Sequence, residues 1–365
     1  MEKIYIYLEN GLFLEANSFG ASGTKTGKLV FNNSTFGYED VITDPSNAGL
    51  FVNFTSVEIG STGINSDDME STKAQISGVI VRNYHDAYSN YRAQKSLSQF
   101  LKEENALGIC DIDTRYLTKI LRDEGSQMMV ASTQISSKDE LAKVLKDAQK
   151  YEEINFIKDS STQAKYIHKS GIWDMDANAY KKASMSDKKV AVLDFGVKKT
   201  FLNELVNANL EVEVYPYNTN ASELISMFEN GVIGAVVLSD GAGNPNIYKD
   251  EIKSVKTLIK ANIPLFAIGL GHQLLALANG VEVSKLENLK QGSHPILGEV
   301  NVEIYTVNSD YVVDSKIEDF ASVEYQTLFT NSAMGLKYNN IKAISVGFNP
   351  PSNSIIYKEF AELVK

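Results

Sequence analysis

The 365-residue chain has one cysteine, Cys110, so it cannot form an internal disulfide bond. Small folds that depend on disulfides are thereby excluded. No apolar run approaches the roughly 18 residues that a membrane-spanning helix needs. The start, MEKIYIYLENGLFLEANSFG, alternates apolar with polar residues and lacks the continuous apolar core of a signal peptide. We therefore expect a cytoplasmic protein with no membrane association.

Positive charge is also in the minority. Thirty-five lysines and arginines stand against 46 aspartates and glutamates, which gives a net charge of -11. A charge of this sign favours solubility and repels phosphate backbones, so we do not expect nucleic acid as a partner. We predict no metal site and no cofactor in this chain. The composition is that of an ordinary globular protein, with 43% hydrophobic residues.

The length exceeds what one hydrophobic core usually supports, so we expect two domains. We place a β-rich domain with a few helices at 1–150, a linker at 151–187, and an open α/β domain with a mostly parallel sheet at 188–365. The linker is expected because residues 135–185 are polar and rich in lysine, without an apolar run long enough for a buried strand.

The first 60 residues are rich in β-branched and aromatic side chains, interrupted by glycine, asparagine and Asp-Pro. We expect antiparallel sheet here, with the Asn-Gly pair at 10–11 forming a two-residue hairpin turn. A later segment has apolar residues at helical spacing, with Asp113 or Thr114 able to cap its start and Gly125 suited to ending it. Another helix is expected over 138–150.

The second half alternates continuous apolar strands with helical segments. The expected strands read VAVLDF, EVEVYPY, GAVVLSD and PLFAIG. Strands that are buried on both faces and joined by helices predict a parallel sheet with right-handed crossovers. In such folds ligands bind beyond the carboxyl ends of the strands.

Several long stretches resemble one family, the small chain of glutamine-dependent carbamoyl-phosphate synthetase. In the first half these are FNNSTFGYEDVITDPSNAG and DIDTRYLTKILRDEG. In the second half, VAVLDFGVKKTFLNELV, LSDGAGNP and LGHQLLALANG are similar to the first strand, the oxyanion loop and the nucleophile elbow of a class I glutamine amidotransferase domain. The resemblance implies both fold and ancestry.

The three positions that match the family's catalytic groups hold Gly269, Asn349 and Pro351. In the family, glutamine hydrolysis needs a cysteine nucleophile, a histidine base and a glutamate that orients the histidine. Glycine offers no nucleophile, an amide has no useful basicity, and proline has no polar side chain. The sequence therefore predicts no functional catalytic residue. Gly269 also suits an elbow whose central residue has strained dihedral angles.

Two other residues could in principle supply chemistry. We interpret Cys110 as a small buried hydrophobe of the first domain. We interpret His272, three positions after the elbow, as a hydrogen-bonded structural residue. Without a thiol or hydroxyl at position 269, it would have nothing to activate.

Part of the family's glutamine pocket is kept. The matching positions hold Ser46, Gly241, Gly243, Leu270, Gln273 and Asn308, followed by Asp310 and Tyr311 where the family has a glycine and usually an aromatic residue. The Asp310 carboxylate would lie beside a ligand that carries a carboxylate itself, so we expect L-glutamine or a related metabolite to bind weakly at most. The retained glycines are equally well explained by turn geometry.

Three hypotheses remain open. The first is a non-hydrolytic small chain that docks on a carbamoyl-phosphate synthetase large chain, where ATP would bind, and supports ammonia-dependent synthesis. The family implies arginine and pyrimidine biosynthesis for such a chain. The second is a stand-alone regulatory pseudoenzyme that binds a metabolite, and the third is a glutaminase with unrecognised catalytic residues.

Overall fold

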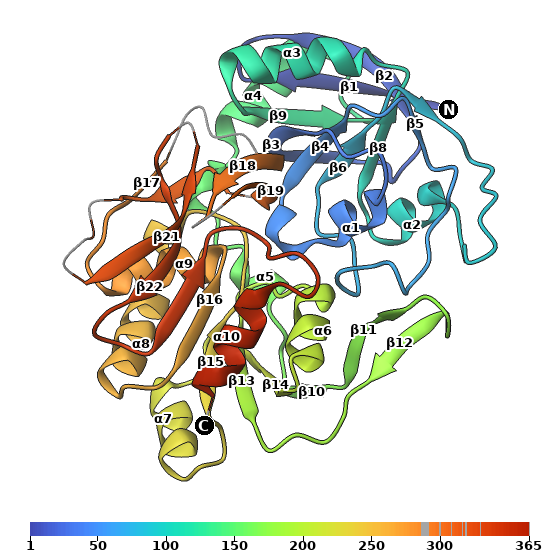
Figure 1. Ribbon diagram of the computed structural model, residues 1–365. Helices are drawn as coiled ribbons and strands as arrows, with labels where there is room; N and C mark the ends of the chain where they lie inside the picture. The colour runs from blue at the N-terminus through green and yellow to red at the C-terminus, as the bar shows by residue number, and fades with distance from the viewer. Residues whose placement is uncertain are drawn as a thin grey trace. The chain divides into compact units, whose positions relative to one another are not determined.

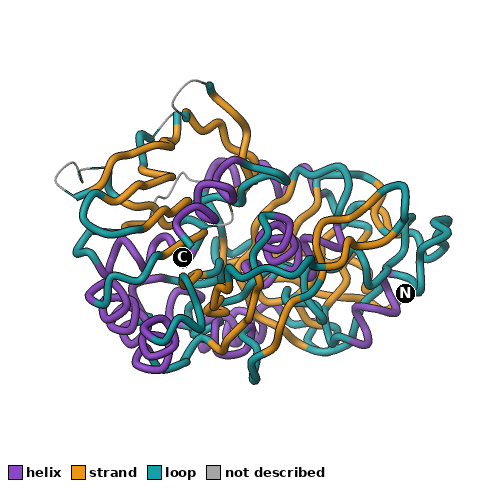
Figure 2. The backbone as a smooth tube through the Cα atoms, turned by 60° about the horizontal axis from the view of Figure 1, so that its bottom comes forward, coloured by secondary structure: helices purple, strands orange, loops and turns teal. Residues whose placement is uncertain are grey.

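The computed structural model describes residues 1–285, 292–298, 301–307, 309–315, 317, 320–328 and 330–364. The chain forms two compact units, Met1–Ile154 and Asn155–Lys365 (Figure 1). In Figure 2 the part of the trace around the N-terminus is mostly strand and loop, with few helices.

The first unit is built on a closed seven-stranded barrel with the order β1, β2, β8, β6, β4, β3, β9. Its strands are β1 Glu2–Leu8, β2 Phe13–Ser18, β3 Thr24–Asn32, β4 Leu50–Phe54, β5 Glu58–Ile59, β6 Gly78–Ile80, β7 Asn83–Tyr84, β8 Leu107–Cys110 and β9 Gln127–Ser132. Its helices are α1 Tyr38–Thr43, α2 Leu97–Glu103, α3 Thr114–Glu124 and α4 Lys138–Asp147, with 3-10 turns η1 Pro45–Asn47 and η2 Tyr151–Glu153.

The barrel is mixed rather than purely antiparallel. Strand β1 pairs antiparallel with β2, as expected, but β3, β4, β6 and β8 pair in parallel. The hairpin loop between β1 and β2 consists of three residues, 9–11. It is closed by a hydrogen bond in which Leu8 N–H donates to Leu12 O (2.9 Å). Gly11 has a φ of 89°, which suits the left-handed position of a three-residue hairpin loop. The expectation of a two-residue turn was therefore wrong by one residue.

Helix α3 has the ends that its sequence indicates. The Asp113 carboxylate accepts hydrogen bonds from the N–H groups of Arg115 and Tyr116, so aspartate is the N-cap rather than Thr114. Gly125 follows with a φ of 84° and donates to Leu121 O. Helix α4 ends at Asp147, three residues earlier than expected.

The second unit contains one large sheet with the order β10, β14, β13, β15, β16, β23, β22, β21, β18, β19. Its strands are β10 Tyr166–His168, β11 Ser170–Asp174, β12 Ala179–Lys182, β13 Lys189–Asp194, β14 Glu211–Pro216, β15 Ala235–Leu238, β16 Leu265–Ile268, β17 Val283–Lys285, β18 Gly292–Leu297, β19 Val302–Val307, β20 Tyr311–Val313, β21 Ala321–Thr327, β22 Ala333–Tyr338 and β23 Ala343–Val346. Its helices are α5 Ile157–Ser160, α6 Lys199–Asn207, α7 Ala221–Glu229, α8 Lys249–Lys260, α9 Leu270–Ala278 and α10 Ile355–Leu363, with the 3-10 turn η3 Pro245–Ile247.

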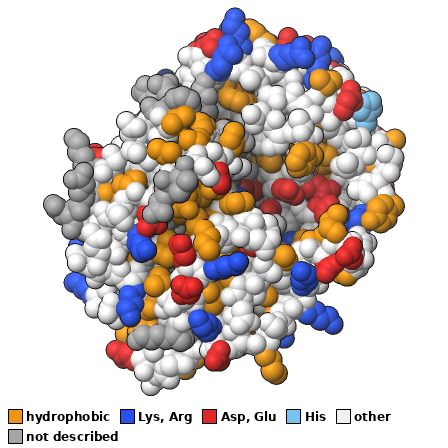
Figure 3. All heavy atoms as spheres, viewed as in Figure 1, with side chains coloured by type: hydrophobic (Ala, Val, Ile, Leu, Met, Phe, Trp, Pro, Cys, Tyr) orange, Lys and Arg blue, Asp and Glu red, His pale blue; other side chains and the backbone are white. Residues whose placement is uncertain are grey.

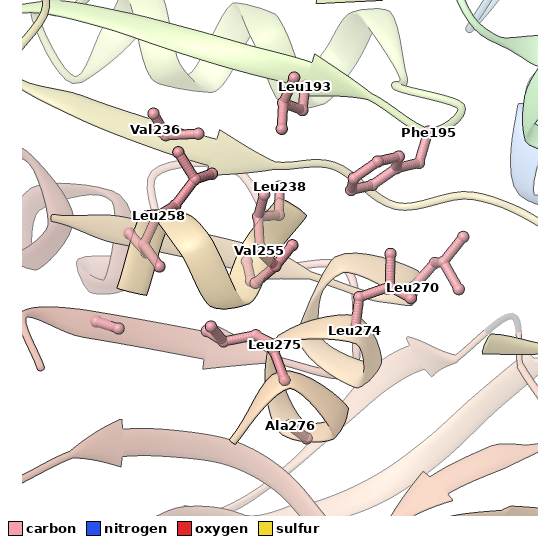
Figure 4. Close-up of a cluster of buried hydrophobic side chains, with 14 of the residues drawn as sticks. Leu193, Phe195, Val236, Leu238, Val255, Leu258, Leu270, Leu274, Leu275 and Ala276 are labelled. Atoms are coloured by element: carbon pink, nitrogen blue, oxygen red, sulfur yellow. The ribbon is translucent and has the colours of Figure 1, made fainter. Parts of the chain in front are cut away.

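The core of this sheet is parallel, as the apolar strands predict. Strands β14, β13, β15, β16 and β23 pair in parallel, and the strands beyond β23 pair antiparallel. Side chains alternate between two buried faces. On one face, helices α8 and α9 contribute Leu258 and Leu274, which pack with Leu193 and Leu238 (Figure 4). On the other face, α6 and α10 cover Val192 and its neighbours.

The stretch 151–187, expected as a linker, contains regular structure. Strand β10 pairs antiparallel with β14, and β11 pairs with β12. Residues from 155 onward belong to the second unit, and Thr162 N–H donates to Asp194 Oδ2 (2.7 Å). These strands are short and partly exposed, so they lack the continuous apolar pattern by which the other strands are recognised.

Candidate functional site

The candidate site lies where β16 turns into α9 at the carboxyl edge of the parallel strands. Gly269 occupies the turn with φ 50° and ψ -114°, and its N–H donates to Val346 O (2.9 Å). A side chain held in such a conformation costs about 1–3 kcal/mol, whereas glycine adopts it with little steric penalty. The sharp elbow expected from the sequence is therefore present, with glycine at its centre.

The space next to Gly269 is already filled. A β-carbon placed on Gly269 would overlap Oδ1 and Cγ of Asp240 and would stand 2.7 Å from Oδ2. Asp240 follows the end of β15 and is 6% exposed. The carboxylate thus takes up the volume into which a side chain at the elbow would begin to grow.

Asp240 is fixed there by the backbone of the elbow. Its Oδ1 accepts hydrogen bonds from Leu270 N–H (2.9 Å) and from Gly241 N–H (2.8 Å). One donor directly follows the elbow residue and the other comes from a neighbouring strand-end loop. In hydrolases with such an elbow, this combination of donors forms the oxyanion hole. Here both donors point at a side chain of the protein itself.

The loop that carries Asp240 has its own structural reasons for glycine. A β-carbon on Gly241 would overlap the backbone oxygen of Phe195 and meet Leu270 Cδ2 at 3.0 Å. Gly243 has a φ of 98°, which favours glycine. Ser239 Oγ accepts from Phe195 N–H (2.8 Å) and donates to Asp240 O (2.8 Å). Close packing and turn geometry therefore account for both glycines without a ligand.

The first turn of α9 is tied to a second loop. Gln273 Nε2 donates to Ser309 Oγ (3.0 Å) and to Tyr311 O (2.8 Å). Asp310 lies between these two residues and is buried. The structure therefore ties Gln273 to the loop that carries Asp310 and Tyr311, and both amide hydrogens of Gln273 have partners in the protein. Asn308 lies outside the described residues.

Ser46 belongs to the first unit, where it lies in the turn η1. Its N–H and its Oγ both donate to Asp44 Oδ1, at 2.9 Å and 2.6 Å. Both side chains are buried. The hydroxyl hydrogen is thus used within its own turn.

The other two catalytic positions lie in the segment between β23 and α10. The N–H of Asn349 donates to Thr306 O (3.2 Å). Pro351 is exposed, and the next residues are fixed by Glu204 of α6, which accepts from Ser352 Oγ (2.5 Å) and Asn353 N–H (3.0 Å). The sequence of this segment, GFNPPSNS, contains no imidazole and no carboxylate.

Neither alternative residue supplies the missing chemistry. His272 is buried, its Nδ1 lies 2.8 Å from Ser345 Oγ, and burial lowers its pKa to about 4. Cys110 lies in the first unit, where burial raises the pKa of its thiol to about 12. A thiol with that pKa is almost entirely protonated at neutral pH and is a poor nucleophile. Both residues have the structural environment that the sequence suggests.

In the described part of the chain, no group of three or more His, Cys, Asp or Glu side chains is placed to hold a metal ion. Within the same residues, no helix is both long enough and apolar enough to span a membrane. Figure 3 shows lysines and arginines on the visible face as separate groups mixed with acidic side chains.

The fold and the elbow define a class of protein, the class I glutamine amidotransferases. Residues 191–355 match the family Glutamine amidotransferase class-I. Residues 6–131 match the family Carbamoyl-phosphate synthase small chain, CPSase domain. The second match adds information, because it covers the barrel unit rather than the amidotransferase fold.

Relatives extend the similarity to the whole chain. The Carbamoyl phosphate synthase small chain of Campylobacter jejuni is 44% identical, over 99% of this chain and 100% of that one. The small chain of Helicobacter pylori strain 26695 is also 44% identical, over 99% of both chains. The crystal structure of a glutamine amidotransferase from Thermotoga maritima has a TM-score of 0.37 at 16% identity, over 45% of this chain and 76% of that one. The two small chains, which are similar over their full length, show that the protein belongs to the carbamoyl phosphate synthase small chain family.

Asp240 is a site residue that the sequence did not predict. Among the positions that match the family's glutamine contacts, only Asp310 stood out as a blocking carboxylate. The available signal was the strand end itself, LSDG, where a carboxylate directly precedes a loop glycine. The parallel pairing of β15 with β16 brings this aspartate to the elbow.

We predict that His272 makes the stability of the protein depend on pH between about 4 and 6.5. Its pKa is lower in the folded state than in the unfolded chain, so protonation favours unfolding. The contribution is complete above pH 6.5 and falls as the pH drops towards 4, by about 3 kcal/mol at most. Urea unfolding of the wild type and His272→Asn at several pH values measures it. An equal slope in both proteins over this range would contradict the assignment.

We predict that Gly269→Ala destabilises the second unit by about 2–5 kcal/mol, from backbone strain and overlap with Asp240. The variant Asp240→Gly removes the overlap but not the strain. The double variant should therefore be more stable than the sum of the two single losses predicts. Urea unfolding of the four proteins forms a double-mutant cycle.

Gly280→Ala is the matched control for this cycle. Gly280 has a φ of 85° and no atom within 4 Å of an added β-carbon, so its replacement reports backbone strain alone. Additive losses at Gly269 and Asp240 would show that the carboxylate does not obstruct the elbow.

Proposed function

We propose that this protein is a carbamoyl-phosphate synthetase small chain that does not hydrolyse glutamine and assembles with a large chain in an ammonia-dependent synthetase. The observation that carries the proposal is the elbow: Gly269 provides no nucleophile, and the Asp240 carboxylate fills the adjoining space. On this proposal, two features account for the lack of hydrolysis: the nucleophile is missing, and a carboxylate fills the space beside its position.

The groups around the elbow support the same proposal. A nucleophile would need a base and an orienting carboxylate, and the positions that match them hold Asn349 and Pro351. His272 faces Ser345 in the interior, and its low pKa makes it a weak base. Members of a catalytic triad act as a unit, so the loss of the nucleophile or the base alone costs about as much activity as the loss of all three.

The pocket supports weak glutamine binding at most. The two N–H groups that would hold an amide carbonyl oxygen donate to Asp240 instead. The amide of Gln273 is used to fix the loop that carries Asp310. A ligand would have to displace these bonds before gaining its own, which lowers its net affinity.

Assembly with a large chain is supported by the extent of the family similarity. It covers the barrel unit as well as the amidotransferase-like unit, and the relatives are similar over their full length. Such a chain would act through binding, with ATP held by the large chain and with arginine and pyrimidine synthesis as the pathways served. The alternative is a stand-alone pseudoenzyme that binds a metabolite.

The purified protein should release no ammonia from glutamine above a buffer control. The measurement is coupled detection of ammonia over a range of glutamine concentrations. A small chain with intact cysteine, histidine and glutamate, purified in the same way, serves as the positive control. Turnover that persists through further purification and changes in an Asp240→Gly variant would contradict the proposal, because contaminating glutaminases would not respond to that substitution.

Mixed with the large chain of its own organism, the protein should form a stable complex. The complex should make carbamoyl phosphate from ammonia, bicarbonate and ATP, and none from glutamine. Size-exclusion chromatography and a carbamoyl phosphate assay with either nitrogen source measure the two properties. Absence of binding at about micromolar concentration would favour the stand-alone alternative over assembly.

A further inference from the structure

Asp240 does more than fill the space beside Gly269. Its Oδ1 is within hydrogen-bond distance of two backbone donors, Leu270 N–H and Gly241 N–H, which come from different strand ends. Both donors belong to buried or partly buried backbone. Two convergent N–H groups of this kind bind an oxyanion or a carbonyl oxygen when a site is used for acyl chemistry. The carboxylate oxygen occupies the place that such an oxygen would take.

We infer that Asp240 is a permanent internal ligand of the oxyanion hole, so that this chain closes its own hole against carbonyl ligands. The inference deepens the proposed function and rests on it for the identity of the site. It adds that the hole itself is intact and would accept a small carboxylate if the Asp240 side chain were removed.

Electrostatics favour this occupant. Hydrogen bonds between backbone N–H groups and a carboxylate are roughly twice as strong as those between neutral groups. The N-terminus of the nine-residue helix α9, which starts at Leu270, adds a positive potential at the same point. A substrate amide oxygen is neutral before attack, so it competes poorly with a tethered anion.

Sterics make the arrangement exclusive. A β-carbon at position 269 would overlap the Asp240 carboxylate where it now lies. A side chain at the elbow and a filled hole are therefore alternatives. Glycine at position 269 and aspartate at position 240 are compatible with each other, and a side chain at position 269 would displace the carboxylate.

The test is chemical rescue of Asp240→Ala by sodium formate, a small carboxylate. Truncation should lower the melting temperature, because it leaves one buried and one partly buried N–H group without an acceptor. Formate should raise the melting temperature of this variant saturably and restore about half or more of the loss, since a ligand that binds only the folded state stabilises it. The wild type should show no saturable response, because its hole is filled.

Two further variants serve as controls. Asp240→Asn keeps an oxygen acceptor of the same shape, so it should lose less stability than Asp240→Ala and should not respond to formate. Leu274→Ala opens space in the apolar core beneath the same helix, away from the two convergent N–H groups, and it should also be insensitive to formate. Sodium chloride at equal concentration corrects for ionic strength.

The response of backbone amide chemical shifts to formate gives a second readout, which a merely structural role for Asp240 would not produce. In Asp240→Ala the amide resonances of Leu270 and Gly241 should move away from their wild-type positions, and formate should return them towards those positions. If Asp240→Ala does not fold, Asp240→Ser, which also leaves the hole partly open, is used in its place. A folded truncation variant without a saturable formate response would overturn the inference.

The outcomes separate this inference from the proposed function. Ammonia release from glutamine bears on hydrolysis, whereas formate binding bears on which group occupies the hole. If formate rescues Asp240→Ala and the wild type hydrolyses glutamine, the proposed function is refuted, whereas the inference that the oxyanion hole is intact stands. If the wild type does not hydrolyse glutamine and formate does not rescue Asp240→Ala, the proposed function stands and the inference that Asp240 is an internal ligand of the hole is refuted.

Discussion

Two hydrogen bonds, from Leu270 N–H and Gly241 N–H to one oxygen of Asp240, join the ends of β15 and β16 at the edge of the parallel sheet. The elbow geometry makes these donors converge, and a buried donor without an acceptor costs about 1–3 kcal/mol. An amidotransferase can leave such a hole to water and substrate. Here the protein provides the acceptor itself, which satisfies the elbow in the absence of any ligand.

The same constraint explains why the elbow persists without a nucleophile. Its backbone is part of the core: a β-carbon on Gly271 would overlap the backbone oxygen of Leu238, and Leu270 and Leu274 pack beneath the sheet (Figure 4). Reshaping the turn would disturb this packing, which costs more than changing one side chain. This packing holds the turn in its conformation, and the glycine at position 269 fits it with the least strain.

The fold could be predicted from the sequence wherever the pattern is local. Buried strands and their helices follow from apolar runs, and the ends of α3 follow from Asp113 and Gly125. Two features were missed, the three-residue hairpin loop and the edge strand β10. The loop differs from the expected turn by only one residue, and β10 has a weak apolar pattern, so neither leaves a clear signal in the sequence. In the site, the missing triad groups could be recognised by position. Asp240 could not, because its role depends on a contact between strand ends 30 residues apart in sequence.

Two segments that match catalytic parts of the family are held by carboxylates of the protein itself. Asp240 fills the elbow, and Glu204 holds Ser352 and Asn353 in the segment after Asn349. Each of these carboxylates fixes a loop next to a position that matches a catalytic group of the family. A domain selected only for its shape would be expected to acquire such contacts. Flexible or strained sites lower stability, and they are no longer maintained once activity does not require them. Under the proposed function, the amidotransferase-like unit is then a rigid partner for assembly, and its former pocket contributes stability to it.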